Sequence, residues 1–368
     1  MKVDFVDLKA QYSSIKDEIN TAILRVLKDA AFTLGPYVQS FERNFAEKHN
    51  AKFCAAVNSG TSALHAALIA GEIGVGDEVI VPANTFFATP EAVSLCGARP
   101  VFVDCEPDYY NMDVSKVEKA ITKRTKAVIA VSLYGHPARL DEIKKIADKQ
   151  NLDLIEDCAQ AHLSQYKDKM VGSFGACGCF SFYCSKNLGA YGEGGAVITD
   201  NEDLYKKILM IRDHGSSKKY HHDIIGHNYR MSGIQGAVLD TKLKYLSMWT
   251  ASRRKNADLY RKYLKGCGSI FLPSEMPQAK HVYHLFVIRA QSRDGLAEFL
   301  KGNGISTQIH YPIPCHLQKA YSFLGYKRGD FPVSEEYADK VISLPMHENL
   351  KEPEIEYVAR NIREFYGE

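Results

Sequence analysis

Short apolar runs, separated by more polar stretches, recur through the first 200 residues of the chain. They are FCAAV (53–57), EVIVP (78–82), PVFVD (100–104), AVIAVS (127–132), LDLIED (152–157), CGCFSF (177–182) and GAVITD (195–200). Each run is rich in residues that favour extended structure, and polar or glycine-containing segments bound it. The pattern therefore predicts seven strands in this part of the chain.

Amphipathic stretches lie between several of these runs: TSALHAALIAGEI, TPEAVSLCG, DVSKVEKAIT and ARLDEIKKIADKQ. In the last of them Leu140, Ile143 and Ile146 recur at helical spacing, with lysines and acids on the other face. Strands that alternate with helices predict a mostly parallel sheet with helices on both faces. Ligands of such sheets bind beyond the carboxyl ends of the strands, so we expect Asp157 and the loop after CGCFSF at a site.

The pattern changes near residue 232. The stretch SGIQGAVLDTKLKYLSMWTASRRKNADLYRKYL predicts one or two long helices, because it contains almost no helix breakers. Shorter pieces follow: a β-rich HVYHLFVIRA, a helix in DGLAEFLKGNG, a loop in IHYPIPCHLQKAY and a terminal helix in EPEIEYVARNIREFYG. A chain of 368 residues also exceeds one simple core. We predict a large domain over residues 1–250 and a smaller one over residues 251–368.

Composition and charge narrow the class of protein. Apolar residues make up 45% of the chain and charged residues 24%, as in ordinary globular proteins. A formal net charge of +2 argues against nucleic-acid binding, and no apolar run is long enough to span a membrane. The N-terminus carries acids where a signal peptide would be apolar, so we expect a cytoplasmic protein. The nine cysteines lack the spacing of a zinc site, and no metal is expected.

Lys186 has the most suggestive setting of any ionisable residue. It lies in SFYCSKNLGAYGEGGAVITD (181–200), between an apolar strand and a glycine-rich turn. A lysine that loses water in such a place has a lowered pKa and becomes a nucleophilic amine that can form a Schiff base. A structural or exposed lysine is the alternative, and the other motifs of the chain are needed to distinguish it from a catalytic lysine.

Two motifs that follow strands fit a ligand with a phosphate and a planar ring. In NSGTSALHAAL (58–68), Ser59, Gly60 and Thr61 would place amides and hydroxyls at a helix N-terminus, which attracts phosphate. An ordinary N-cap is the other interpretation of the same residues. In PANTFFATPEAV (82–93), Phe86 or Phe87 would either stack on a ring or belong to the core.

Two further motifs supply charge. In EDCAQAH (156–162), Asp157 would face a protonated ring nitrogen or cap a helix, while Gln160 would bond a ring oxygen or lie at the surface. His162, in the same motif, has the same two interpretations as Gln160: a ligand contact or a surface position. The basic run HGSSKKYHHDIIGHNYRMSGIQGA (214–237) contains Lys219 and Arg230, which are suited to phosphates. Its histidines indicate a solvated loop, since no acid or cysteine completes a metal site.

The motifs NSGTSAL, EDCAQAH, SFYCSKNLGAYGEGGAVITD and GHNYRM, in this order, resemble those of the DegT/DnrJ/EryC1/StrS sugar aminotransferases. The resemblance extends from DLKAQY near the start to IHYPIPCHLQKAY near the end, and so covers nearly the whole chain. It implies an α/β protein with fold type I of the pyridoxal phosphate (PLP) enzymes. Such a protein has a large domain with a mixed, mostly parallel sheet and a smaller α+β C-terminal domain. It also implies a homodimer with shared active sites.

The resemblance implies roles for individual residues. Lys186 would hold PLP as a Schiff base and transfer protons, and Asp157 would pair with the pyridinium nitrogen. Phe86 would stack on the ring and Gln160 would bond its phenolic oxygen. The phosphate-binding positions are Ser59, Gly60, Thr61 and Ser181, with Asn228 of the partner subunit. The substrate-binding positions are His162, Tyr183, Lys219, Arg230, His310 and Tyr311.

The implied reaction transfers an amino group from L-glutamate to a nucleotide-linked keto sugar. KNLGAYGEGG and GSSKKYHHDIIGHN look most like enzymes that aminate C3 of dTDP-3-keto-6-deoxyhexoses. DLKAQY and VSLYGH also resemble enzymes of UDP-linked 3-keto uronic acids, and NYRM is shared with enzymes that aminate C4 of 4-keto-6-deoxy sugars. Relatives that dehydrate the sugar have histidine in place of Lys186, which disfavours dehydration here. A regulator that binds PLP without catalysis is a further alternative.

Two positions depart from the family pattern. Leu163 stands where the family usually has glycine, and Cys184-Ser185 where relatives often have proline and a small residue. Both are expected to flank the sugar pocket. They leave the PLP chemistry intact and bear on which sugar is accepted.

Overall fold

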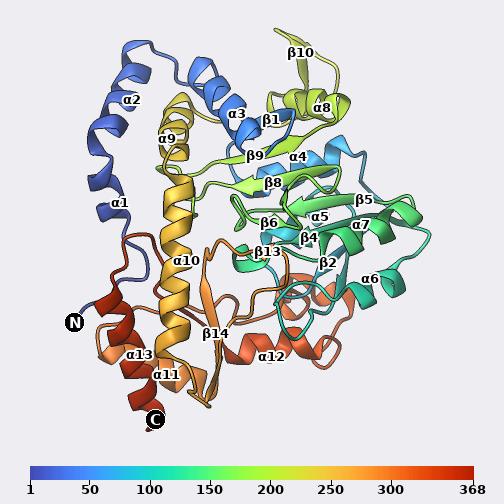
Figure 1. Ribbon diagram of the computed structural model, residues 1–368. Helices are drawn as coiled ribbons and strands as arrows, with labels where there is room; N and C mark the ends of the chain where they lie inside the picture. The colour runs from blue at the N-terminus through green and yellow to red at the C-terminus, as the bar shows by residue number, and fades with distance from the viewer.

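A seven-stranded sheet forms the centre of the computed structural model, which describes all 368 residues (Figure 1). Its strands lie in the order β1-β9-β8-β5-β4-β2-β3. They are β1 (Phe53–Val57), β2 (Glu78–Pro82), β3 (Arg99–Val103), β4 (Thr125–Val131), β5 (Asp153–Asp157), β8 (Cys177–Ser181) and β9 (Gly195–Thr199). All pairs from β8 to β3 are parallel, whereas β9 is antiparallel to both of its neighbours. The predicted α/β class with a mixed, mostly parallel sheet is confirmed.

Helices cover both faces of this sheet. One face packs against α3 (Pro36–Lys48), α6 (Val114–Ala120), α7 (Leu140–Lys149) and α9 (Gly233–Leu243). The other face packs against α4 (Gly60–Ala70), α5 (Ala88–Leu95) and α8 (Glu202–Arg212). Successive side chains of a strand point to opposite faces of the sheet, so each strand contributes to both apolar cores. In β2, Ile80 packs in the core with α3, α6, α7 and α9, while Val79 and Val81 pack in the core with α4, α5 and α8.

The C-terminal part has its own sheet and core. Strands β12 (Ile270–Phe271), β14 (Phe286–Ala290) and β15 (Val341–Leu344) pair antiparallel. They pack with α10 (Leu246–Tyr263), α11 (Arg293–Gly302) and α13 (Glu352–Tyr366) around a separate apolar cluster. Val3, near the N-terminus, pairs with Ile305 and is buried in the same cluster. Residue 250, the predicted boundary between the two domains, lies within α10. Because this helix is continuous across that position, the boundary stays a prediction.

The remaining elements connect or extend these two parts. The N-terminal helices are α1 (Leu8–Ser14) and α2 (Lys16–Lys28), and α2 packs against α9. A small sheet joins β13 (Ala279–Lys280), β6 (Gln165–Tyr166) and β7 (Lys169–Met170), and a hairpin pairs β10 (Ser216–Lys218) with β11 (His221–His222). The predicted loop at 309–321 contains the 3₁₀ segments Cys315–Leu317 and Lys319–Leu324, and α12 (Pro332–Lys340) follows. Figure 1 shows β10 extending away from the body of the molecule.

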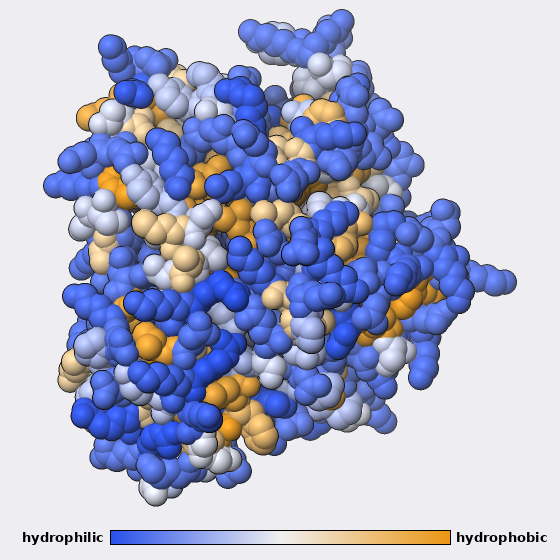
Figure 2. Space-filling model, in the orientation of Figure 1, coloured by the Kyte–Doolittle hydropathy of each residue, from blue (hydrophilic) through white to orange (hydrophobic).

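The outer surface is mainly polar on the face seen in Figure 2, where hydrophobic areas are small and scattered. None of the helices combines the length and the apolar character that crossing a bilayer requires.

Candidate active site

A cavity of about 490 Å³ opens beyond the carboxyl ends of β5 and β8. Loops after β1, β2, β4, β5 and β8 contribute to it, as expected for an open α/β sheet. Most of the residues proposed from the sequence line this one cavity: Ser59, Gly60, Thr61, Phe86, Asp157, Gln160, Ser181, Tyr183, Lys186, His310 and Tyr311. The fold therefore brings together motifs that are more than 200 residues apart in the sequence.

Lys186 lies just after β8 and presents its amine to the cavity. Its backbone N–H donates to the carbonyl of Tyr183 at 2.8 Å, but its ammonium makes no hydrogen bond or ion pair. Protein surrounds the ammonium, and this desolvation lowers the pKa of Lys186 to about 8, against the opposing carboxylates of Asp157 and Glu193. At a pKa of about 8, about a tenth of the amine is neutral at pH 7, far more than for an ordinary lysine, and the neutral form is the nucleophile.

Asp157 closes the end of β5 and is almost completely buried. Its Oδ2 accepts from the Thr89 hydroxyl at 2.8 Å, and its Oδ1 accepts from the Ala159 N–H at 3.1 Å. Because the Thr89 hydroxyl is used in this way, Thr85, at 2.9 Å, donates to Thr89. Burial raises the pKa of Asp157, while these hydrogen bonds and Lys186 oppose the rise. A buried carboxylate in this position is suited to a cationic ligand group.

The sequence motif that supplied Phe86 also contains both threonines. The interpretation of PANTFFATPEAV considered only its phenylalanines, and so missed the hydroxyls that orient Asp157. Thr89 lies in the first turn of α5 and Thr85 lies before the helix, so their contact depends on the path of the loop after β2 and has no helical signal in the sequence.

The N-terminus of α4 lies at another side of the cavity. Ser59 is the N-cap, because its Oγ accepts from the Ser62 N–H at 3.0 Å. The following N–H groups of Gly60 and Thr61 belong to the first helical turn and have no partner within the helix. A Cβ on Gly60 would lie 2.6 Å from the Cβ of Ser181, so only glycine allows this close approach to β8. Both interpretations of the motif are thus compatible: an N-cap and an anion-binding turn.

Phe86 and Gln160 both line the cavity. Phe86 is 55% exposed, and its ring is tilted against Tyr311 with centroids 5.6 Å apart. Gln160 accepts from the Tyr134 N–H at 2.6 Å and donates to the Tyr311 hydroxyl at 3.1 Å. These bonds fix the amide so that its second N–H remains available to a ligand.

His162 does not reach the cavity. It is fully buried, with its ring 5.6 Å from each of Phe180 and Phe182, and neither ring nitrogen has a hydrogen-bond partner. Burial lowers the pKa of His162 well below its usual value, so the ring is neutral. The structure therefore places this predicted substrate-binding residue in the core of the large sheet.

Three predicted residues lie outside the cavity of their own chain. Lys219 is exposed in the turn between β10 and β11, and Arg230 pairs with Asp213. Asn228 forms a bridge with Asp213, and its carbonyl accepts from Asn58 Nδ2 at 3.2 Å. None of the three residues lines the cavity of its own chain.

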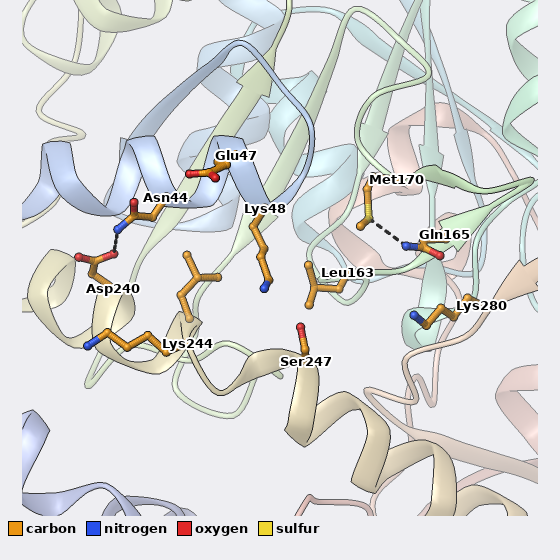
Figure 3. A pocket seen from close by; sticks show the side chains of 11 residues that line it. Asn44, Glu47, Lys48, Leu163, Gln165, Met170, Asp240, Lys244, Ser247 and Lys280 are labelled. Atoms are coloured by element: carbon orange, nitrogen blue, oxygen red, sulfur yellow. Dashed lines mark hydrogen bonds between the residues drawn. The ribbon is translucent and has the colours of Figure 1, made fainter.

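Leu163 was expected to flank the sugar pocket, and the structure places it elsewhere. It lines a different hollow of about 580 Å³, where Figure 3 shows Lys48 of α3 and Ser247 of α10 facing it. Its φ of 62° lies in the left-handed region, which is consistent with glycine in relatives at this position. Cys184 is half-buried and does not line the active-site cavity, although the neighbouring Ser185 does.

Several lining residues were not predicted. Glu193, His284 and Gln308 contact the cavity together with Val131 and Leu133. Glu193 was visible in the quoted glycine-rich motif, but His284 lies in a stretch read only as β-rich. Its Nδ1 lies 3.2 Å from Oδ1 of Asn187, the residue after Lys186.

The residues present fit PLP at each of its chemically distinct parts. An amine of lowered pKa suits an aldehyde, the buried Asp157 suits a protonated ring nitrogen, and the open turn of α4 suits a phosphate. This fold with this site defines a PLP-dependent aminotransferase. The chain belongs to the DegT/DnrJ/EryC1/StrS aminotransferase family, whose profile matches residues 13–363.

Named relatives are similar over essentially their whole length. The chain is 43% identical to a "pleiotropic regulatory protein" of Geobacillus stearothermophilus, covering 100% of this chain and 99% of that one. It is 42% identical to dTDP-3-amino-3,4,6-trideoxy-alpha-D-glucose transaminase of Streptomyces venezuelae, covering 99% and 96%. It is 40% identical to UDP-2-acetamido-2-deoxy-3-oxo-D-glucuronate aminotransferase of Pseudomonas aeruginosa, covering 97% and 98%.

Solved structures agree with this assignment. The crystal structure of S. venezuelae DesV in complex with a ketimine intermediate superposes with a TM-score of 0.98 at 41% identity, covering 100% of this chain and 99% of that one. Other solved relatives contain PLP or its amine form, pyridoxamine phosphate (PMP). The protein is thus a transaminase that uses PLP, as the sequence indicated.

Proposed function

We propose that this enzyme transfers the amino group of L-glutamate to C3 of a dTDP-linked 3-keto-6-deoxyhexose. The similarity to the S. venezuelae transaminase, which extends over nearly the whole chain, supports the substrate class. The observation that carries the transaminase chemistry is the pair formed by Lys186 and Asp157 in one cavity. A complete pair of this kind favours catalysis over regulation, despite the name of the Geobacillus relative.

Each residue would contribute a defined step. The neutral Lys186 amine would bind the cofactor aldehyde and, once displaced by the donor, would carry a proton from the donor α-carbon. Asp157 would hold the ring nitrogen protonated, with Thr89 fixing the carboxylate. The N–H groups of Gly60 and Thr61 would bind the phosphate. The bound cofactor itself supplies the electron-withdrawing ring that the chemistry requires.

A homodimer would complete the site. Among the lining residues Lys186 is the only lysine or arginine, yet the cofactor phosphate and a nucleotide diphosphate both require positive charge or donors. The segment from β10 to Arg230 carries Lys218, Lys219 and Arg230 and lies outside its own cavity. We propose that Asn228 of the partner subunit and Lys219 of the partner subunit enter the site.

A mixing experiment tests this sharing. Lys186→Ala and Lys219→Ala proteins would each be inactive, and co-expression would produce mixed dimers. If the residues come from different subunits, a mixed dimer has one intact site, and activity would recover to about a quarter of the wild-type value. If both residues serve the site of one chain, mixed dimers have no intact site and no activity returns.

A UDP-linked 3-keto uronic acid is the second candidate substrate, because the Pseudomonas relative carries that substrate type in its name. A panel of dTDP-, UDP- and GDP-linked keto sugars, with product mass as the readout, separates the candidates. Amination of the dTDP sugar in preference to the others is expected. Loss of oxygen without gain of nitrogen would identify a dehydratase, and protein that takes up no PLP would refute the proposal.

The nine cysteines support a cytoplasmic location, which we also propose. None of them is in a disulfide, as expected in a reducing compartment. Fractionation of cells that produce the protein, with a periplasmic marker as control, is the direct measurement.

A further inference from the structure

The turn that follows Lys186 is fastened to helix α9. Gln235 of α9 accepts from the N–H of Tyr191 at 2.8 Å and donates to its carbonyl at 3.0 Å. Seven residues further along the helix, Lys242 donates to the carbonyl of Gly189 at 2.7 Å, and its ammonium lies 4.3 Å from the centre of the Tyr191 ring. Residues 189–191 are therefore held at two points by one rigid helix.

Glu193 is positioned by this fastened turn. It follows Gly192, whose φ of 142° is open to glycine alone, and precedes the start of β9 at Gly195. A Cβ on Gly195 would lie 2.1 Å from the carbonyl oxygen of Ser59, so the chain is also fixed on this side. Between the two fixed points Glu193 is exposed, lines the cavity, and makes no ion pair or hydrogen bond.

The carboxylate of Glu193 dominates the charge at the cavity mouth on this chain. Asp157, the other lining acid, is buried at the inner end, and Lys186 is the single lining cation. Burial lowers the pKa of His310 to about 4 and that of His284 well below its usual value, so both rings are neutral at pH 7. The lining residues of this chain thus include two carboxylates and one lysine, and of the two carboxylates only that of Glu193 is exposed.

We propose that Glu193 is a specificity-determining residue that accepts a hydrogen bond from a sugar hydroxyl and disfavours sugars that bear their own carboxylate. A carboxylate is an acceptor only, and sugar hydroxyls are donors, so a neutral sugar gains a charge-assisted bond. A uronate brings a like charge to the same place and loses affinity. This inference rests on the proposed function, and it favours the deoxyhexose over the uronic acid.

Equilibrium binding to the PMP form tests the inference without turnover. UDP-glucose and UDP-glucuronate share the nucleotide and differ at C6 by a hydroxymethyl group against a carboxylate, so calorimetry with both isolates the effect of that charge. Wild-type protein should bind UDP-glucose about tenfold more tightly, because an exposed carboxylate is partly screened. In Glu193→Gln the two dissociation constants should converge. The wild-type difference should also shrink as salt rises, while the variant should show little salt dependence.

Glu47→Gln is the matched control, because Glu47 is also exposed, makes no ion pair and lines the separate hollow of Figure 3. It should retain the wild-type ratio of dissociation constants. The inference is overturned if Glu193→Gln retains that ratio as well, or if the ratio does not respond to salt. Failure of the proposed function would look different: no keto sugar would be aminated, although the binding ratio would still shift in Glu193→Gln.

Discussion

The lowered pKa of Lys186 makes a quantitative prediction about how the protein without cofactor captures PLP. Only the neutral amine attacks the aldehyde, so the capture rate follows the neutral fraction of Lys186. Burial lowers its pKa from 10.5 to about 8. At pH 7 the neutral fraction is then about 10%, against about 0.03% for an ordinary lysine, a difference of roughly 300-fold.

The assay is the rate of appearance of the bound-cofactor absorbance after PLP is mixed with cofactor-free protein between pH 6 and pH 10. The rate should rise about tenfold per unit up to about pH 8 and then level off, because deprotonation is complete above the pKa. Lys186→Ala is the control that measures capture by other lysines. In Asp157→Asn the rate should level off at a lower pH than in the wild type, since the Asp157 carboxylate raises the pKa of Lys186. A wild-type rate that keeps rising through pH 10 would refute the reasoning.

Three further predictions concern residues that support the site or the fold. Thr89→Val removes the hydroxyl that donates to Asp157 at 2.8 Å and should weaken PLP binding about tenfold in a fluorescence titration; unchanged affinity would count against the role of Thr89. Gly60→Ala places a Cβ 2.6 Å from Ser181 and should lower both PLP affinity and Tm, whereas Gly302→Ala, at an open position, should alter neither by much. Arg212→Met leaves the buried Glu42 without its partner and should cost roughly 3–5 kcal/mol in denaturant unfolding; a cost below about 1 kcal/mol would show that the pair is unimportant.

The sequence predicted the central sheet well because strand composition and the alternation with helices are local signals. All seven predicted strands are present within about two residues of their expected ends. The short strands β6, β7 and β13 were not predicted, since two-residue strands depend on tertiary pairing rather than composition. Helices α3 and α8 are amphipathic, with Phe41, Phe45 and Ile208 in the cores, so their periodicity is also a local signal in the sequence.

The site was predictable in part for a similar reason. Asp157 ends β5 and Lys186 follows β8, and the carboxyl ends of these two neighbouring strands meet at one edge, so the proximity of the two residues follows from topology. His162 lies in the same motif as Asp157, but its side chain is directed into the core, and chain position alone does not reveal that direction. Leu163 likewise lines the hollow beside α3, and its left-handed backbone conformation is not one that a leucine in the sequence predicts.

The antiparallel strand β9 has a consequence for how enzymes of this architecture change their substrates. The chain leaves the sheet at Ser181, passes through Lys186 and Glu193, and re-enters at Gly195, which pairs with Ser181 itself. Residues 182–194 therefore form a loop whose two ends are held by one pair of facing residues in the sheet. Substitutions within this loop can alter the sugar that is accepted while the register of β8 and β9 stays fixed. The sugar that is accepted can thus change while the reaction stays the same, although Lys186 and Glu193 lie in a single short loop.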